Sequence, residues 1–257
     1  NSRVNEGDVI NFTVYMDKIN MVLDTSGGLP TLAFTIGTTV VQASYASHTT
    51  STILFNYTVL AGQTDTDGVT LNANGVSYNG SIYKDTYGNL ASIVYPAWTV
   101  GSVLVDTTSP TLTITSSRNA ILAGQTATIT FTFSEAPTGF AASDITTTGG
   151  TLGTPTVSST DTKVYTATFT PTANSNANGI VSVTNGVFTD SAGNANTDGS
   201  DANNFLTLAV DTLIPTIAVS SNKSSLQGGD SATLTFTLSE AATNFLASDI
   251  TVNGGTL

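Results

Sequence analysis

The chain has no cysteine, and few of its 257 residues are charged. Without cysteine, no disulfide can hold the fold together, and no thiolate can bind a metal or attack a substrate. Six basic residues stand against eighteen acidic ones, which gives a net charge of −12. Nucleic acids and anionic membranes bind clusters of Lys and Arg, so neither is an expected partner. No apolar run reaches the roughly 18 residues that a membrane-spanning helix needs.

Histidine is almost absent as well. The single one, His48, lies in Ser-His-Thr-Thr at 47–50, which is typical of a turn between strands. A Ser-His-Asp triad would have to use it. Several carboxylates recur at matching places along the chain, which suits a structural site better than the paired acids of glycoside hydrolysis. The sequence therefore predicts that the protein is not an enzyme.

The chain is rich, however, in internal repetition. Asp106, in Val-Asp-Thr-Thr-Ser-Pro, returns as Asp211 in Val-Asp-Thr-Leu-Ile-Pro, 105 residues later. Glu135, in Thr-Phe-Ser-Glu-Ala, returns as Glu240 at the same spacing. Self-similarity at one period over many positions indicates tandem modules.

The repeat predicts three modules, at residues 1–105, 106–210 and 211–257. Module one is divergent and lacks the leading strand that module two has at 111–115. Module three is partial and corresponds to the N-terminal half of module two. Because the chain begins and ends inside modules, we expect it to be a segment of a longer polypeptide.

Alternation of polar and apolar residues predicts the secondary structure. Residues 126–133 alternate between polar side chains and Ala, Ile, Phe and Phe, which is the pattern of a strand with one buried face. The strands expected in module two are 111–116, 126–133, 141–147, 154–159, 163–170, 179–184 and 204–210. About seven short strands in one module of this size are typical of a β-sandwich. The predicted fold class is all-β, with tandem immunoglobulin-like β-sandwich modules.

Three motifs, in this order and spacing, resemble the bacterial Ig-like repeats of giant surface adhesins. They are Val-Asp-Thr-Thr-x-Pro at 105–110, Thr-Phe-Ser-Glu-Ala at 132–136 and Asp-x-x-Gly-Asn at 190–194. Module one resembles a sister subtype, on Phe-Asn-Tyr-Thr-Val at 55–59 and Asp-Thr-Asp-Gly at 65–68. The resemblance implies extender modules, often stiffened by calcium, that project an adhesive end away from a bacterial cell.

The order of the strands predicts where the carboxylates meet. A trace of module two, strand by strand up and down the sandwich, brings Asp106, Glu135 and Asp190 to the pole where the chain enters the module. The preceding loop of module one carries Asp65 and Asp67. Oxygen ligands from several loops, without His or Cys, are the chemistry of Ca²⁺. We therefore expect calcium at this junction, where it would offset charge repulsion and fix the angle between modules.

The alternative is that these acids only solubilise turns, and that the aspartate of Asp-x-x-Gly-Asn caps its own loop. At the second junction, Asp211 and Glu240 are the expected metal ligands. The exit loop of module two, at 174–179, has no acidic residue. We therefore expect the second junction to bind calcium weakly or not at all.

Two further functions fit part of the sequence. Seven of the eight tyrosines and the only tryptophan, Trp98, lie before residue 100. Aromatic rings stack on sugars, so module one is a candidate carbohydrate-binding module, unless these rings fill its core. The missing leading strand would also allow strand donation between copies, in a surface layer or filament. The main expectation is an extracellular spacer of a bacterial cell-surface adhesin or fibre, with neighbouring modules as its partners and surface glycans or other copies as further candidates.

Overall fold

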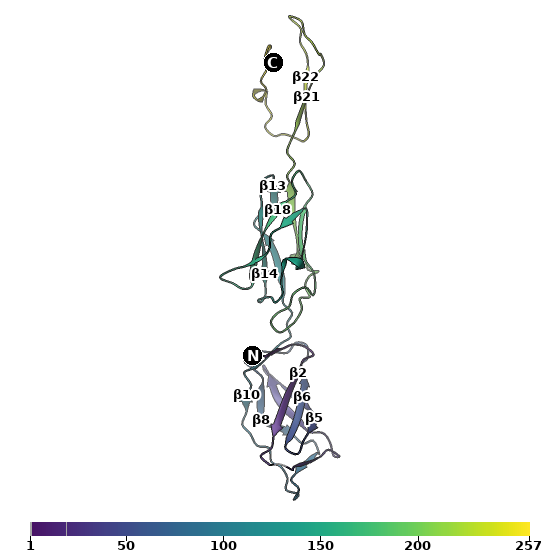
Figure 1. The fold of residues 1–257 in the computed structure, drawn as a ribbon, viewed down its shortest axis with the longest axis vertical. Coiled ribbons are helices and arrows are strands. Elements are labelled where there is room, and N and C mark those ends of the chain that lie inside the picture. Colours follow the sequence, from purple (N-terminus) through teal and green to yellow (C-terminus); the bar gives the residue numbers. More distant parts are fainter. Residues whose placement is uncertain (1, 19) are drawn as a thin grey trace.

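The computed structural model describes residues 2–18 and 20–257, and these form three β-rich units that follow one another along one long axis (Figure 1). Helical structure in this described part is limited to three 3-10 turns: η1 (Ala142–Asp144), η2 (Ala202–Asn204) and η3 (Ala247–Asp249). None of its helices is long and apolar enough to cross a membrane. The predicted all-β fold class is confirmed.

Module one is built around a six-stranded antiparallel sheet. Its strands, in spatial order, are β10 (Trp98–Thr99), β8 (Thr70–Ser77), β4 (Thr31–Ile36), β5 (Thr39–His48), β6 (Thr52–Thr58) and β2 (Val9–Tyr15). Two small sheets complete the module: β1 (Ser2–Val4), β11 (Val103–Asp106) and β7 (Thr64–Asp65), and the pair β3 (Val22–Asp24) and β9 (Ile82–Lys84). Aromatic rings fill the centre, where the rings of Phe12 and Phe34 lie 4.7 Å apart.

Module two is a sandwich of two sheets. One sheet holds β12 (Leu112–Ser116), β14 (Ala127–Phe133), β18 (Val164–Pro171) and β16 (Gly150–Leu152), with β17 (Thr156–Val157) also paired to β18. The other holds β13 (Ala120–Leu122), β20 (Phe205–Asp211), β19 (Gly179–Val183) and β15 (Ile145–Thr148). Along β14, alternate residues from Ala127 to Phe133 are buried, so the period-two pattern does mark one core-facing side.

Module three contains a strand pair that matches the pair β12 and β14 of module two. Its strands β21 (Ile217–Ser221) and β22 (Leu234–Leu238) pair with Ile217 opposite Leu238. In module two, Leu112 lies opposite Phe133 in the same way. The sequence repeat is therefore also a repeat of strand register.

The observed strands of module two follow the expected ones, with three differences, of which the first is that the short strand β13 was not expected. The segment expected as a strand at 141–147 begins as the turn η1, because the Asp144 carboxylate accepts the Ala141 amide at 2.7 Å. The strand β16 was not expected at all. Gly149 has φ 70°, and a Cβ there would clash with the Asn178 carbonyl oxygen. A glycine at this point lets the chain pass from one sheet to the other.

Module one follows the same plan from its second strand onward. β1 runs parallel to β11, as β13 runs parallel to β20. β2 pairs with β6, as β14 pairs with β18. Among residues 2–18 and 20–105, no strand takes the place of β12, so β2 lies at the edge of its sheet.

Candidate metal centre at the first module junction

Three carboxylates come together where module two begins. Asp106 ends β11, Glu135 follows β14, and Asp190 lies in the loop after β19. One carboxylate oxygen of each residue lies within 4.8 Å of the other two. The structure thus brings together three of the residues that the sequence assigned to a calcium site. Three hard oxygen ligands from three separate segments match the ligand preference of Ca²⁺.

The loop of Asp190 is held by its own carboxylate. Asp190 is 1% exposed. Its Oδ1 accepts the backbone amides of Ala192, Gly193 and Asn194 at 2.7–2.9 Å. Its Oδ2 accepts the side-chain amide of Asn194, at 2.7 Å, and no other hydrogen bond from residues 2–18 or 20–257. Asp190 therefore caps its loop and still keeps acceptor capacity on Oδ2, because a carboxylate oxygen can accept more than one bond.

Negative charge is in excess at this site. Burial raises the pKa of Glu135, and the nearby charges of Asp190 and Asp106 raise it further. Arg3 acts in the opposite direction on the same pKa. A bound cation would stabilise the ionised form of Glu135, because opposite charge at short range favours ionisation.

Arg3 was not identified by sequence reasoning. Its Nη1 atom lies 3.9 Å from Oδ2 of Asp106. The residue belongs to β1, where it pairs with Leu104. Module one therefore supplies a single guanidinium to a group of carboxylates that follows it. The signal in the sequence is its distance from Gly7, which matches the distance of Ala120 from Gly124 and so places Arg3 in a strand beside β11.

Asp65 and Asp67 lie outside this group of three, as far as the described residues show. Asp65 is 4% exposed and pairs with Val105. Its carboxylate accepts the amides of Gly37 and Gly68, each at 2.7 Å. Asp65 thus fastens the exit loop of module one to β11, while Asp67 lies exposed in that loop. Metal ligation by these two residues stays a prediction.

The linker residues Thr107 and Thr212 form hydrogen bonds with the module that precedes each linker. Thr107 Oγ1 donates to the carbonyl of Gln63 at 3.0 Å. Thr212, 4% exposed, donates to the carbonyl of Thr172 at 2.6 Å and accepts the Ser175 amide at 2.9 Å. At the second junction, whose exit loop has no acids, these hydrogen bonds anchor the start of the linker to module two without a metal.

Asp211 and Glu240 have only part of the arrangement seen at the first junction. Asp211 accepts the amide of Leu213 at 3.3 Å, as Asp106 accepts that of Thr108 at 3.1 Å. Within the described residues, neither belongs to a close group of three acidic side chains. Calcium binding at this junction remains an expectation from the sequence.

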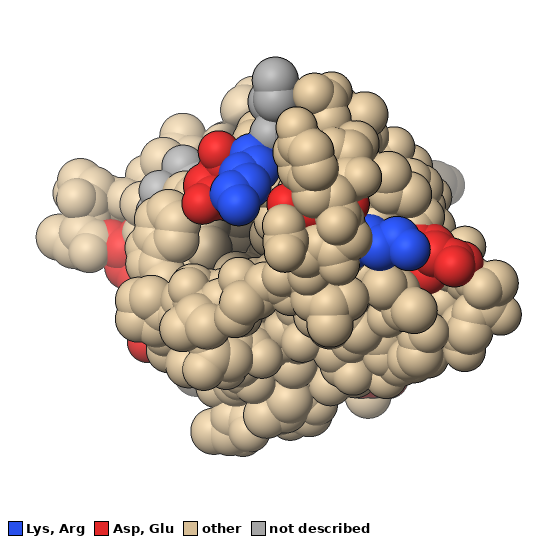
Figure 2. Space-filling view, turned by 90° about the horizontal axis from the view of Figure 1, so that it is seen from below, with Lys and Arg blue, Asp and Glu red and all other residues tan. Residues whose placement is uncertain are grey.

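Module one has a lysine where module two has Glu135. Matching Gly7 with Gly124 places Lys18 at that position, and Asp85 corresponds to Asp190. Hydrogen bonds from Asn89 lower the pKa of Asp85, and Lys18 lowers it further. Figure 2, which looks from below at the end face of module one, shows the few basic side chains close beside acidic ones. Charge at this end is thus partly balanced by the protein itself.

Most aromatic side chains of module one lie in or against its core. Tyr83 is 2% exposed, and four other tyrosines pack against the core half-buried. Tyr15, Tyr87 and Trp98 are instead largely exposed. His48 ends β5 and shares a 2.6 Å hydrogen bond with the hydroxyl of Tyr45.

The chain is similar to a known protein family and to a solved structure. A family model described as a bacterial Ig-like domain matches residues 106–207 and 211–257, which is more than half of the chain. The solved structure of FdeC, an Escherichia coli adhesin, is similar over 82% of this chain and 62% of that chain, with 14% identity and a TM-score of 0.39. The chain thus spans less than two thirds of the FdeC structure. No curated protein sequence matches it.

Proposed function

The chain belongs to the bacterial Ig-like domain family, and on this basis we propose that it is a spacer segment of an extracellular bacterial surface adhesin, stiffened by calcium at its first junction. The family assignment agrees with the resemblance that the sequence motifs indicated. The spacer role is supported by the arrangement of the modules end to end (Figure 1). Each of the first two modules has its own buried core, at residues 10–105 and 112–210. Every added module therefore adds length.

The observation that carries the calcium proposal is the position of Asp106, Glu135 and Asp190. Two of these carboxylates lie in loops of module two, and the third, that of Asp106, ends β11, where the linker begins. At separations of 4.8 Å or less, each pair of like charges repels by at least roughly 1 to 3 kcal/mol for effective dielectric constants between 80 and 20. A divalent cation would turn that repulsion into attraction and hold the linker against module two.

Contacts between the modules support an effect on their relative angle. Asn194 Nδ2 donates to the carbonyl of Asp106 at 2.8 Å. A Cβ added to Gly193 would lie 3.2 Å from the side-chain nitrogen of Asn5, so the loop of module two approaches module one closely. A cation bound by Asp190 would therefore fix a loop that touches both the linker and the preceding module.

The test compares the full chain in calcium and in excess chelator. Calcium is expected to raise the melting temperature and, in small-angle X-ray scattering, to narrow the distribution of interdomain distances. The Glu135→Gln variant should lose most of both effects. Glu240→Gln is the matched control, because it changes the same motif in module three. If melting and scattering are the same in calcium and in chelator, the calcium part of the proposal is wrong.

A further inference from the structure

The loop between β19 and β20 holds a second buried carboxylate, that of Asp198. This residue is 7% exposed. Its Oδ2 accepts the backbone amide of Leu112 at 2.6 Å and the side-chain amide of Asn204 at 3.0 Å. Leu112 is the first residue of β12. Asp198 is therefore a contact through which the loop holds the first strand of module two.

The other oxygen of this carboxylate is poorly satisfied. Oδ1 accepts the side-chain amide of Asn196 at 3.5 Å, which is longer than an ordinary N–H···O bond. Within residues 2–18 and 20–257, no basic side chain forms an ion pair with Asp198. Buried charges in proteins are normally paired or bound to a metal. Asp198 thus has both the charge and the free acceptor of a cation ligand.

A second unsatisfied oxygen lies beside Asp198. Asn204 is 0% exposed, and its Oδ1 has no hydrogen-bond partner in the described part of the chain. Its Nδ2 donates to the carbonyl of Asp198 at 2.9 Å and to Oδ2 of the same residue at 3.0 Å. These bonds fix the orientation of the amide, because turning it over would set its oxygen against two acceptors. The amide nitrogen and oxygen share one carbon, so Oδ1 lies next to Asp198.

Two neighbouring acceptors without good donors, one of them charged, favour a cation over a water molecule. A water molecule would donate to both oxygens and leave the charge of Asp198 uncompensated. A cation satisfies both oxygens and neutralises that charge as well. A buried acceptor without a partner otherwise destabilises the fold.

A second carboxylate lies in the same turn. Asp201 precedes η2, and its amide donates to the carbonyl of Asp198 at 2.8 Å, while its own carbonyl accepts the Asn204 amide at 3.0 Å. The side chain of Asp201 is exposed and does not cap η2. All these side-chain groups offer oxygen, which is the ligand type that Ca²⁺ prefers.

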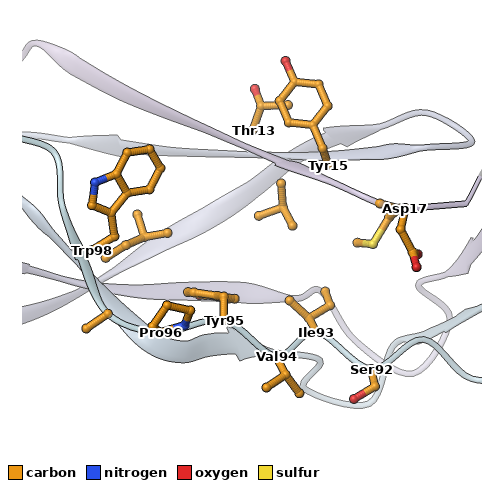
Figure 3. Close-up of a pocket in the computed structure, with 13 residues that line it drawn as sticks. Thr13, Tyr15, Asp17, Ser92, Ile93, Val94, Tyr95, Pro96 and Trp98 are labelled. Carbon is orange, nitrogen blue, oxygen red and sulfur yellow. The ribbon is translucent and has the colours of Figure 1, made fainter.

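Module one lacks this arrangement. With the period of 105 residues, Asp198 matches Ile93 and Asn204 matches Thr99. Figure 3 shows the matching segment of module one, residues 92–98, which carries no acidic side chain. The paired oxygens of module two are therefore not a by-product of the repeated motifs.

We propose that the loop 196–204 of module two binds Ca²⁺, with Asp198 Oδ1 and Asn204 Oδ1 as inner ligands and with Asp201 and water on the solvent side. The bound ion would hold the Asp198 carboxylate in place against the Leu112 amide. Because β12 is paired with β14 along its whole length, the ion would fasten the first strand of the module to its last loop.

This site is separate from the metal centre at the first junction. Asp198 does not belong to the group formed by Asp106, Glu135 and Asp190, and the proposed ligands all lie within one module. With few protein ligands, its dissociation constant for calcium is expected to be on the order of 10⁻⁴ to 10⁻³ M, as in other extracellular modules.

The test is a calcium titration of the full chain carrying both Glu135→Gln and Glu240→Gln, followed by ¹H–¹⁵N NMR. This background lacks one proposed ligand at each junction, so failure of the junction proposal leaves the result unaffected. The backbone amide signal of Leu112 and the side-chain amide signals of Asn204 should shift saturably at millimolar calcium.

In the same background, Asp198→Asn should weaken this binding at least tenfold, while its amide oxygen still accepts the Leu112 amide. Asp201→Asn, at an exposed position, should weaken binding without affecting the fold. Asp161→Asn is the matched control, because it removes an exposed aspartate from another turn of module two, and it should bind calcium like the background. Melting curves in chelator check that each variant is folded.

Three results would overturn the proposal. The first is that calcium leaves the signals of Leu112 and Asn204 unchanged, which would mean that water alone satisfies the two oxygens. The second is that Asp198→Asn binds calcium as tightly as the background. The third is that Asp161→Asn weakens binding as much as Asp201→Asn, which would show a general effect of charge and not a site.

Discussion

The side-chain amide of Asn194 reaches the backbone carbonyl of Asp106 at 2.8 Å, across 88 residues of sequence. The same amide also donates to Asp190 Oδ2. One side chain thus joins the loop that carries one proposed ligand to the linker that carries another. The spacing of the acidic group therefore depends on a residue that is not itself acidic.

Replacing Asn194 should destabilise module two. Asn194→Ala removes two hydrogen bonds at a residue that is 8% exposed. The buried Oδ2 of Asp190 then lacks its donor, which costs about 1 to 3 kcal/mol. Urea unfolding measures this loss. Asn89→Ala is the matched control, since Asn89 is exposed in the equivalent loop of module one, and its loss should be clearly smaller. Equal losses would contradict this account.

The pH dependence should show the excess negative charge at the first junction. The pKa of Glu135 is raised in the folded protein, so the folded state binds the proton more tightly than the unfolded state. Without calcium, stability should therefore fall as pH rises from the ordinary glutamate pKa through the raised one. Other carboxylates have lowered pKa values, so the measurement is the difference between wild type and Glu135→Gln. A difference that does not change with pH would contradict the prediction.

Arg3 should compete with calcium. Its guanidinium lies 3.9 Å from an Asp106 oxygen, and a monovalent cation near a divalent one raises the energy of the bound state. Arg3→Gln should tighten calcium binding, by about tenfold at low salt, as measured by isothermal titration calorimetry. Arg118→Gln is the control, because Arg118 has no ion pair to these acids among the described residues. Weaker calcium binding by Arg3→Gln would show that the arginine supports the site instead.

The second junction should keep its rigidity without metal. Thr212→Val removes the hydroxyl that bonds to Thr172 and Ser175, at a cost of about 1 to 3 kcal/mol. Scattering should show a more variable angle between modules two and three, equally in calcium and in chelator. In Thr107→Val, by contrast, calcium should restore the narrow distribution at the first junction. If calcium also narrowed the distribution of the angle in the Thr212→Val variant, the second junction would bind the metal as well.

The sequence predicted the meeting of Asp106, Glu135 and Asp190 because each lies at the end of a strand or in the loop after one, and the strand order then determines the pole. The sequence could not predict that the carboxylate of Asp65 is buried and accepts hydrogen bonds from two backbone amides. The amide of Gly37 that binds its carboxylate lies in a turn 28 residues away, and no local pattern indicates that contact. The strands β13 and β16 were missed because three-residue strands carry too little periodicity to detect.

The hydrogen bonds of Thr107 and Thr212 to the preceding modules were not predicted, for another reason. Both residues lie inside the repeated motif, and its acidic residue indicates a contact with the following module. Neighbouring residues of an extended segment point in opposite directions. In this linker the valine and the threonine contact the preceding module, while the aspartate between them faces the next one.

In module two, β13 is the second strand along the chain, and it pairs in parallel with the last strand, β20. Module one has the same relationship between β1 and β11. Tension applied along the long axis of Figure 1 would pull such paired strands past each other in shear. Their hydrogen bonds would then resist the load together, rather than open one after another as in an unzipping hairpin.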